Sequence, residues 1–386
     1  SASAGNGYWI NTTSNACTIT LPSAATAGDQ IIFVDYARTW GTNAIIIDSN
    51  GLNFQGEDDT YTVDYDTSGQ AVNLVYSGAT IGWTPSSDIV NALEPVVPAT
   101  QKAIFGYGGS NYSLTNLVSS SGVVGSDVTG VGTGRTRLAA AGYGFDKAIF
   151  GYGSTAGAST EVSITNKVSN EGVVATNTTG VGTARRDLAA SIYGGDKAIF
   201  GYGWNGSNLS MTNLVSNSGV VAADVTGVGT ARNGVAGVKY GGTKGMFGYG
   251  YDSSSYLSMT NLVSDSGVVA TDTTGVGTGR QDPSATSYGG DKAIFGYGRT
   301  GVNLSMTNLV TNQGVVGSDV TGVGTVRYEG AAAGYGGDKA IFAYGNNGPW
   351  LNISNKVSSS GVVASDTSGV GTARDGLGAA GYSTSA

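Results

Sequence analysis

The chain has 386 residues, of which 19 are basic and 27 acidic, and it contains no histidine. The resulting net charge of −8, without any basic tract, argues against binding to nucleic acid or to an anionic membrane. The lack of histidine removes the commonest general base and metal ligand. No apolar run reaches the ~18 residues that a membrane-spanning helix needs.

Residues 1–83 predict a small all-β domain. Apolar and polar residues alternate in six segments that turn residues separate. The single cysteine, Cys17, lies inside one of these segments, so we interpret it as a buried apolar residue rather than a nucleophile. Because the chain begins at Ser1 and not at methionine, we expect it to be processed, trimmed or excerpted. The expected strands are 7–11, 17–21, 30–36, 44–48, 61–65 and 71–76.

Short motifs of this domain are similar to a known family. In chain order they are YWINTT at 8–13, TITLP at 18–22, AGD at 27–29, VDY at 34–36, NAIIIDSNG at 43–51, LVY at 74–76 and GW at 82–83. This order resembles a small β-domain of tail-fibre and other virion proteins of tailed bacteriophages. The resemblance covers most of 1–83 and implies a virion structural protein, in which this domain sits close to or within a fibre and forms oligomers. It brings no catalytic residues.

Residues 84–101 are expected to be a linker, because Pro85, Pro95 and Pro98 are three of the six prolines of the chain. The rest of the sequence, 102–386, is built from a repeat. The motif KAIFGYG or a close variant occurs six times, and each copy continues into a TN-rich stretch, then GVV, then TGVGT-x-R or an equivalent. The copies begin at Lys102, Lys147, Lys197, Lys244, Lys292 and Lys339.

Each copy predicts four short β-segments, which in the second copy are 147–153, 162–169, 180–185 and 188–193. A period in the forties with several such segments is typical of a β-propeller. No Ala- and Tyr-rich segment precedes the first copy, and the missing one appears at 376–382. We therefore expect an all-β protein, with a small N-terminal β-domain and a six-bladed β-propeller closed by the C-terminal strand, which removes two open sheet edges. The repeats are similar to kelch-type repeats only in general, since they lack the paired glycines followed by a spaced Tyr and Trp.

One arginine recurs in every copy, and it has two interpretations. A ring of arginines could hold a carboxylate, as in sialidases, but the S-x-D-x-G-x-T-W boxes of that family are absent. Strict recurrence favours a structural role, in which each arginine joins neighbouring strands or blades through a bidentate pair with an acidic residue. The arginines are Arg135, Arg185, Arg232, Arg280, Arg327 and Arg374, and the residues eight positions earlier are Asp127, Asn177, Asp224, Asp272, Asp319 and Asp366.

The copies diverge directly after each GYG motif or its variant, and these loops occupy the same place in every repeat. We therefore expect them on one face of the propeller. They are rich in Gly, Asn and Ser and carry aromatic residues, a mixture that suits binding to a glycan or a protein surface. The alternative is that hairpin loops vary without function. The candidate ligand-binding residues are Tyr112, Trp204, Tyr251, Tyr256, Arg299 and Trp350.

The sequence therefore predicts a non-enzymatic virion structural protein. The preferred hypothesis is a tail-fibre or receptor-binding component that binds a host-surface glycan or protein. The alternatives are a capsid or tail decoration protein with purely structural contacts and, less favoured, a glycan-cleaving propeller. No catalytic residue, metal site or cofactor is predicted. The expected partners are a host-surface molecule, other virion proteins and further copies of this chain through 1–83.

Overall fold

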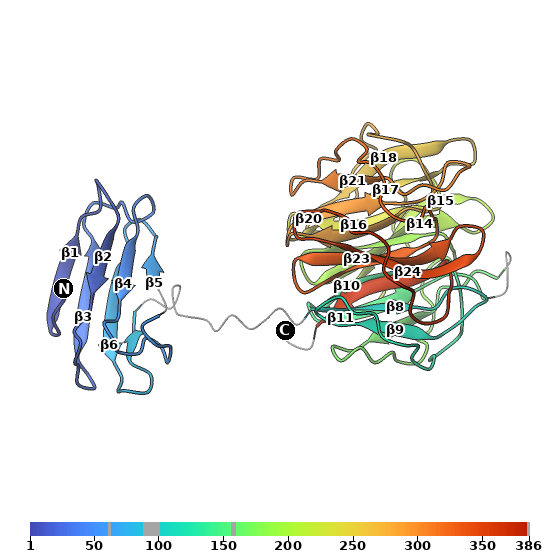
Figure 1. The fold of residues 1–386 in the computed structure, drawn as a ribbon. Helices are drawn as coiled ribbons and strands as arrows, with labels where there is room; N and C mark the ends of the chain where they lie inside the picture. Colours follow the sequence, from blue (N-terminus) through green and yellow to red (C-terminus); the bar gives the residue numbers. More distant parts are fainter. Residues whose placement is uncertain (61–62, 88–100, 156–159, 384–386) are drawn as a thin grey trace. The chain divides into compact units, whose positions relative to one another are not determined.

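The computed structural model describes residues 1–60, 63–87, 101–155 and 160–383, which form strands, turns and loops without any helix (Figure 1). None of these residues belongs to a helix that could cross a membrane. The chain divides into two compact units, Ser1–Val97 and Pro98–Ala386. We call them the N-terminal domain and the repeat domain.

The N-terminal domain contains two sheets. Strands β1 and β3, and likewise β2 and β4, pair in parallel. The remaining pairs are antiparallel. From β1 to β4 the chain alternates between the sheets, so each parallel pair is connected through a strand of the other sheet. One sheet has the order β1 (Asn6–Ile10), β3 (Gln30–Asp35), β6 (Ala71–Tyr76) and β7 (Trp83–Pro85), and the other has the order β2 (Cys17–Thr20), β4 (Ile45–Asp48) and β5 (Val63–Tyr65).

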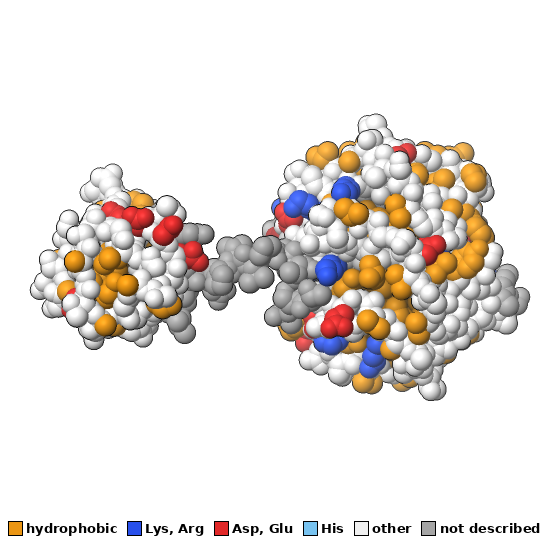
Figure 2. Space-filling model, turned by 60° about the horizontal axis from the view of Figure 1, so that its bottom comes forward, with side chains coloured by type: hydrophobic (Ala, Val, Ile, Leu, Met, Phe, Trp, Pro, Cys, Tyr) orange, Lys and Arg blue, Asp and Glu red, His pale blue; other side chains and the backbone are white. Residues whose placement is uncertain are grey.

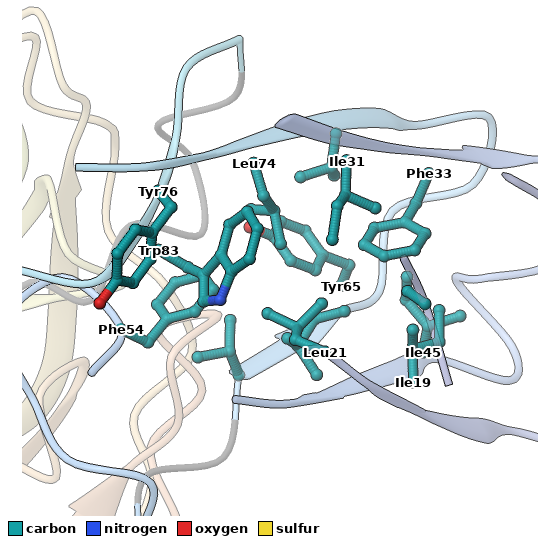
Figure 3. Close-up of a cluster of buried hydrophobic side chains, with 14 of the residues drawn as sticks. Ile19, Leu21, Ile31, Phe33, Ile45, Phe54, Tyr65, Leu74, Tyr76 and Trp83 are labelled. Carbon is teal, nitrogen blue, oxygen red and sulfur yellow. The ribbon is translucent and has the colours of Figure 1, made fainter. Parts of the chain in front are cut away.

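Alternate side chains of both sheets form one hydrophobic core (Figure 3). In β3, for example, Ile31 and Phe33 are fully buried whereas Ile32 between them is exposed. At one end of the core Tyr76 and Trp83 make an edge-on aromatic contact, with ring centroids 5.4 Å apart. Cys17 is partly buried and packs against this core, as expected, and burial raises the pKa of its thiol.

Strands occur at all six positions that alternation predicted in the N-terminal domain, although residues 61–62 lie outside the described residues. Strand β7 was not predicted. It pairs with β6, and Ser86 N then donates to Asn73 O at 2.8 Å. The predicted domain boundary at residue 83 is therefore corrected to at least Ser87, since Thr84 and Pro85 belong to the sheet. Pro85 is tolerated because β7 is an edge strand. The rest of the predicted linker, 88–100, lies outside the described residues.

The described residues of the repeat domain form six antiparallel sheets of three strands each. In every sheet the Ala- and Tyr-rich strand pairs with the KAIFG strand, which pairs in turn with the TN-containing strand. The sheets are β25 (Gly378–Tyr382), β8 (Lys102–Gly106) and β9 (Thr115–Val118); β10 (Ala139–Tyr143), β11 (Lys147–Gly151) and β12 (Thr165–Val168); β13 (Ala189–Tyr193), β14 (Lys197–Trp204) and β15 (Asn208–Val215); β16 (Ala236–Tyr240), β17 (Lys244–Tyr251) and β18 (Tyr256–Val263); β19 (Ser284–Tyr288), β20 (Lys292–Gly296) and β21 (Thr307–Val310); and β22 (Ala331–Tyr335), β23 (Lys339–Asn346) and β24 (Trp350–Val357).

The last strand of the chain completes the first sheet. Strand β25 pairs with β8 so that Tyr382 lies opposite Lys102, in the same register that places Tyr143 opposite Lys147 in the next sheet. The predicted pairing of 376–382 with the first repeat is thus confirmed. The first strands of the six sheets also contact one another in the cyclic order β25, β10, β13, β16, β19, β22 and back to β25.

The third of the four β-segments predicted in each repeat is wrong, whereas the fourth, 188–193 in the second copy, is confirmed as β13. In the second copy, 180–185 makes no strand. Gly182 has a φ of 74°, which an extended strand does not allow. The next residue, Thr183, donates its backbone N–H to Asp224 at 3.0 Å, so this segment bonds to the following sheet through a side chain and adds no strand to its own sheet.

Candidate functional site

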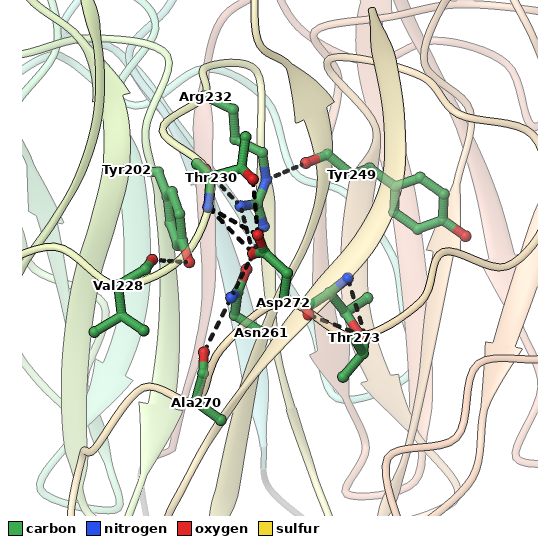
Figure 4. Close-up of polar contacts among 10 residues, drawn as sticks. Tyr202, Val228, Thr230, Arg232, Tyr249, Asn261, Ala270, Asp272 and Thr273 are labelled. Atoms are coloured by element: carbon green, nitrogen blue, oxygen red, sulfur yellow. Dashed lines mark hydrogen bonds and ion pairs between the residues drawn. The ribbon is translucent and has the colours of Figure 1, made fainter.

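Six buried arginines connect neighbouring sheets of the repeat domain, and Figure 4 shows one of them. Arg232 donates from Nε to Tyr249 O and from Nη2 to Asn261 Oδ1 of the next sheet, both at 2.7 Å. Its Nη1 donates to Thr230 O at 2.9 Å. Its guanidinium lies 4.3 Å from the centroid of the Tyr202 ring. At most 1% of each arginine is exposed in the whole set: Arg135, Arg185, Arg232, Arg280, Arg327 and Arg374.

The structural interpretation of these arginines is supported, but the predicted acidic partner is wrong. Asp224, eight residues before Arg232, accepts hydrogen bonds from Thr183 N and Oγ1 of the preceding sheet, at 3.0 and 2.7 Å. Arg232 itself bonds to neutral oxygens, and Asp272 of the next sheet approaches its Nη1 only to 3.8 Å. Because the guanidinium groups are enclosed, they are not available to a ligand carboxylate.

Three of the six predicted ligand-binding residues line one groove. Tyr251, Tyr256 and Arg299 come from two successive variable loops, and a third loop adds Asn346. We call this the loop groove. Its lining consists of Tyr251, Tyr256, Gln281, Arg299, Gly301, Asn303, Tyr328, Asn346 and Gly348.

The two tyrosines form an aromatic wall of the loop groove. They lie opposite each other at the ends of β17 and β18, where the hairpin extends beyond the regular strand pairing. Their ring centroids are 5.2 Å apart, at an interplanar angle of 39°. Tyr256 is 39% exposed, so its ring is available for contact with a ligand.

Arg299 is held in a fixed position in the same groove. Its guanidinium carbon lies 4.2 Å from the centroid of the Tyr328 ring, and its Nη2 lies 3.1 Å from Asp282 Oδ2. About a third of the Arg299 side chain, 31%, is exposed. The protein therefore contacts one face of the guanidinium group, and the exposed part of the side chain faces solvent.

The other three candidates do not line the loop groove. Trp204 ends β14 and lies opposite Asn208. Trp350 begins β24 opposite Asn346 and is 38% exposed. Tyr112 donates its backbone N–H to Gly108 O at 2.8 Å. Each belongs to the hairpin of its own repeat.

A second group of candidate functional residues, which was not predicted from the sequence, lies two positions after the recurring arginines. Their backbones form a closed cycle of hydrogen bonds, in which each N–H donates to the preceding member and Arg137 N donates to Gly376 O at 2.6 Å. All six have positive φ angles, between 50° and 61°. The members of this axial ring are Arg137, Asp187, Gly234, Asp282, Glu329 and Gly376.

Three carboxylates meet inside this axial ring. Oxygen atoms of Asp187, Asp282 and Glu329 all lie within 4.8 Å of one another. Arg137 Nη2 lies 3.3 Å from Glu329 Oε1, and Arg137 Nε lies 3.7 Å from Asp187 Oδ1. The exposed fractions of the three acidic side chains are 14%, 7% and 9%. We call Arg137 and these three carboxylates the axial charge cluster.

The electrostatics of the axial charge cluster favour a protonated carboxyl group. Burial raises the pKa of Glu329 to about 8, and the Asp282 carboxylate adds to this effect whereas Arg137 opposes it. Burial likewise raises the pKa of Asp187 to about 6, against the opposing effect of Arg137. Arg186 and Arg299 also pair with Asp187 and Asp282, at 3.7 and 3.1 Å, but these cations do not offset the burial of Glu329, which therefore retains a proton near neutral pH.

Among the described residues, these three carboxylates form a cluster that could supply oxygen ligands to a cation. The cavity beside them has a volume of about 80 Å³. The cluster is connected to the loop groove through Asp282, which accepts from Gln281 Nε2 at 3.0 Å and pairs with Arg299. The signal in the sequence was present, because the position two after the recurring arginine is charged in four copies and glycine in two.

No family model matches the chain, and no curated protein matches it either.

Proposed function

We propose that the repeat domain is a six-bladed β-propeller closed by the pairing of β25 with β8. Two cyclic features support this proposal. The first strands of the six sheets contact one another in a cycle, and the hydrogen bonds of the axial ring return to the residue from which they start. The pairing of β25 also covers an edge of β8 that would otherwise be open.

We infer that the chain is a non-enzymatic virion structural protein of a tailed phage, displayed at the particle surface. Its loop groove binds a host-surface glycan, as in a tail-fibre or receptor-binding component. The order of motifs in the N-terminal domain supports a virion protein, and this domain docks to other virion proteins or to copies of itself. The mixed-sign, low charge of the chain supports partners other than nucleic acid.

One observation carries the glycan proposal: Tyr251, Tyr256 and Arg299 meet in the loop groove beside side-chain amides. Aromatic rings pack against the apolar faces of sugars, while amides and a guanidinium bond to hydroxyl and carboxylate groups. The cavity at the axial charge cluster, about 80 Å³, is well below the ~300 Å³ at which ligand pockets begin. Binding in the groove, without cleavage at the cluster, is therefore the better-supported function.

Binding of the full chain to host cells and to a broad glycan panel tests this proposal. The double variant Tyr251→Ala, Tyr256→Ala should lower the affinity at least tenfold, about 1.4 kcal/mol. Tyr112→Ala and Trp204→Ala make matched aromatic deletions in hairpins outside the groove, so they should leave the affinity unchanged. Equal affinity of the double variant and the wild type, with unchanged folding, would contradict the proposal.

A second candidate function, decoration of a capsid or tail, is favoured by a different surface. One valine in the turn after the third strand of every sheet is 60–65% exposed. In Figure 2 hydrophobic side chains are more widespread than charged ones on the visible face of the repeat domain. Such a repeated apolar surface suits contact with another protein. Binding to virion subunits that is lost on exchanging these valines for serine would favour decoration over glycan binding. The valines are Val123, Val173, Val220, Val268, Val315 and Val362.

A further inference from the structure

A cavity of about 220 Å³ lies between the first strands of all six sheets of the repeat domain. The axial ring precedes these strands in sequence, whereas the cavity lining extends to residues that follow them, such as Phe145 and Gly195. The cavity therefore opens at the end of the strands remote from the axial charge cluster and the loop groove. We call it the axial cavity.

The second, third and fourth positions of each first strand line the axial cavity, and the second and fourth lie on the same face of the strand. The second position is always small, alanine in five strands and glycine in β16. The fourth position varies whereas the fifth is tyrosine in all six strands, and the fourth position carries Lys239, the single charged residue among the second and fourth positions. A varying position on a recurring scaffold is where specific binding is expected. The fourth-position residues are Gly142, Ile192, Lys239, Ser287, Gly334 and Gly381.

Lys239 forms no ion pair with any carboxylate of the described residues. This contrasts with the lysines at the turns between first and second strands, because four of them pair with the preceding aspartate; Lys339 at the rim of the cavity lies 2.7 Å from Asp338. Burial lowers the pKa of the Lys239 ammonium, and no acidic neighbour offsets this effect. The axial cavity thus contains a partly desolvated cation without a counter-charge.

A side-chain amide lies across the cavity from this lysine. A Cβ atom added at Gly381 would lie 3.0 Å from Gln101 Nε2, and one added at Gly334 would lie 3.9 Å from Gln101 Oε1. Gln101 therefore occupies the space beside these two glycines. Gly381 lies in β25 and Gly334 in β22, which are three and two places from the strand of Lys239, β16, in the cycle of six. An ammonium and an amide thus flank the space that the glycines leave open.

We propose that the axial cavity binds a small oxyanion, a carboxylate or phosphate group, with Lys239 as its counter-charge and Gln101 as a second hydrogen-bond donor. Such an anion supplies the charge that the cavity lacks, and it accepts hydrogen bonds from both groups. This site is independent of the loop groove, so the two proposals are tested separately.

The experiment is a calorimetric titration of the full chain with inorganic phosphate and, separately, with acetate, at constant ionic strength set with chloride. We expect saturable binding of at least one of these anions, weakened at least tenfold by Lys239→Met. Lys244→Met removes an exposed turn lysine and should leave the affinity unchanged. The anion that binds with the higher affinity shows whether phosphate or carboxylate is preferred.

A second variant retains the charge but fills the cavity. Gly381→Val places a side chain against Gln101 and should also abolish binding, with the melting temperature of each variant as the control for folding. The proposal is overturned if the wild type binds neither anion saturably. It is equally overturned if Lys239→Met and the wild type bind with the same affinity.

Discussion

The buried arginines show how a cation can be stabilised inside a protein mainly by neutral partners. Each guanidinium lies over a tyrosine ring, at 3.8 to 4.3 Å from the ring centroid. Burial lowers the pKa of Arg232, but the backbone and amide oxygens around it satisfy its donors. Burial also raises the pKa of the Tyr202 hydroxyl, which receives this cation on its ring, to about 12.

Arg232→Lys should therefore destabilise the repeat domain although it retains the charge. A lysine cannot reach Tyr249 O, Asn261 Oδ1 and Thr230 O together, so buried acceptors lose their donors, at a cost of about 2–4 kcal/mol in the free energy of unfolding. Denaturant unfolding followed by tryptophan fluorescence measures this change. The same exchange at the exposed Arg38 should have little effect, and equal stability of Arg232→Lys and the wild type would refute the expectation.

The axial charge cluster predicts a dependence of stability on pH. Glu329 has a pKa of about 8 in the folded protein against an ordinary value of 4.5. A raised carboxyl pKa gives stability that is complete below pH ~4.5 and is lost as the pH rises to ~8. Asp187, raised from 3.8 to about 6, acts in the same direction. The melting temperature of the repeat domain should therefore fall by several degrees between pH 5 and pH 9.

Glu329→Gln isolates this contribution, because glutamine cannot ionise. In this variant the melting temperature should fall clearly less between pH 5 and pH 9 than it does in the wild type. Carboxylates such as Asp224 have lowered pKa values. The stability that they contribute to the protein is therefore lost only in acid, and they do not disturb the measurement. An unchanged slope in Glu329→Gln would disprove the role of this residue.

At this scale recurrence in the sequence identified the structural arginines but revealed neither their partners nor the axial charge cluster. Six identical arginines could be recognised as a scaffold because every copy needs the same contact. Their partners could not be recognised, since a spacing of eight residues does not reveal that Asp224 faces the preceding sheet. The axial charge cluster was missed for a related reason: its position differs in charge from copy to copy, and only the cycle brings its members together.

At the scale of elements, the strand sequence alone does not decide which segments pair. The third predicted segment contains apolar residues, yet its glycine recurs with φ between 73° and 76° in all six copies. A Cβ on Gly229 would collide with the Asp272 carboxylate of the next sheet. The glycine is therefore needed for a contact between sheets. The alternation of apolar and polar residues within one segment does not reveal such a contact.

Deleting 376–386 should expose the edge of β8 and destabilise the repeat domain. The deletion removes β25, with five paired positions along β8, and also removes Leu377 and Tyr382 from hydrophobic clusters. We expect a lower melting temperature and self-association, because an unpaired edge strand invites pairing with another chain. Sedimentation velocity measures this outcome; a monomer as stable as the wild type would contradict it.

Moving the same segment provides the control. A permuted chain, in which 376–383 is joined through Gly-Gly-Asp to Lys102, restores the strand in the order found in the other five sheets. Since the register of β25 with β8 equals that of β10 with β11, this variant should recover most of the stability.

At the scale of the molecule, the two domains have separate cores. Fragments 1–97 and 98–386 should therefore each fold, and calorimetry should show the transition of each fragment at the temperature found in the full chain. Sedimentation of 1–97 tests in addition whether this domain forms the oligomer expected of a fibre component. A fragment that remains unfolded would show that the domains depend on each other.

The junctions between neighbouring sheets all have the same direction. One sheet contributes a threonine and an arginine. The next sheet contributes two residues, of which one is an asparagine and the other an aspartate or asparagine. The junction between Thr372 and Asp127 follows the same rule although 245 residues separate its partners. The same contacts therefore form whether the two halves of a junction are close in sequence or come from the two ends of the repeat domain. A piece of two or three repeats carries one free surface of each kind, and such surfaces are complementary. Fragments of this chain should accordingly reassemble without a template, three or two copies to a ring.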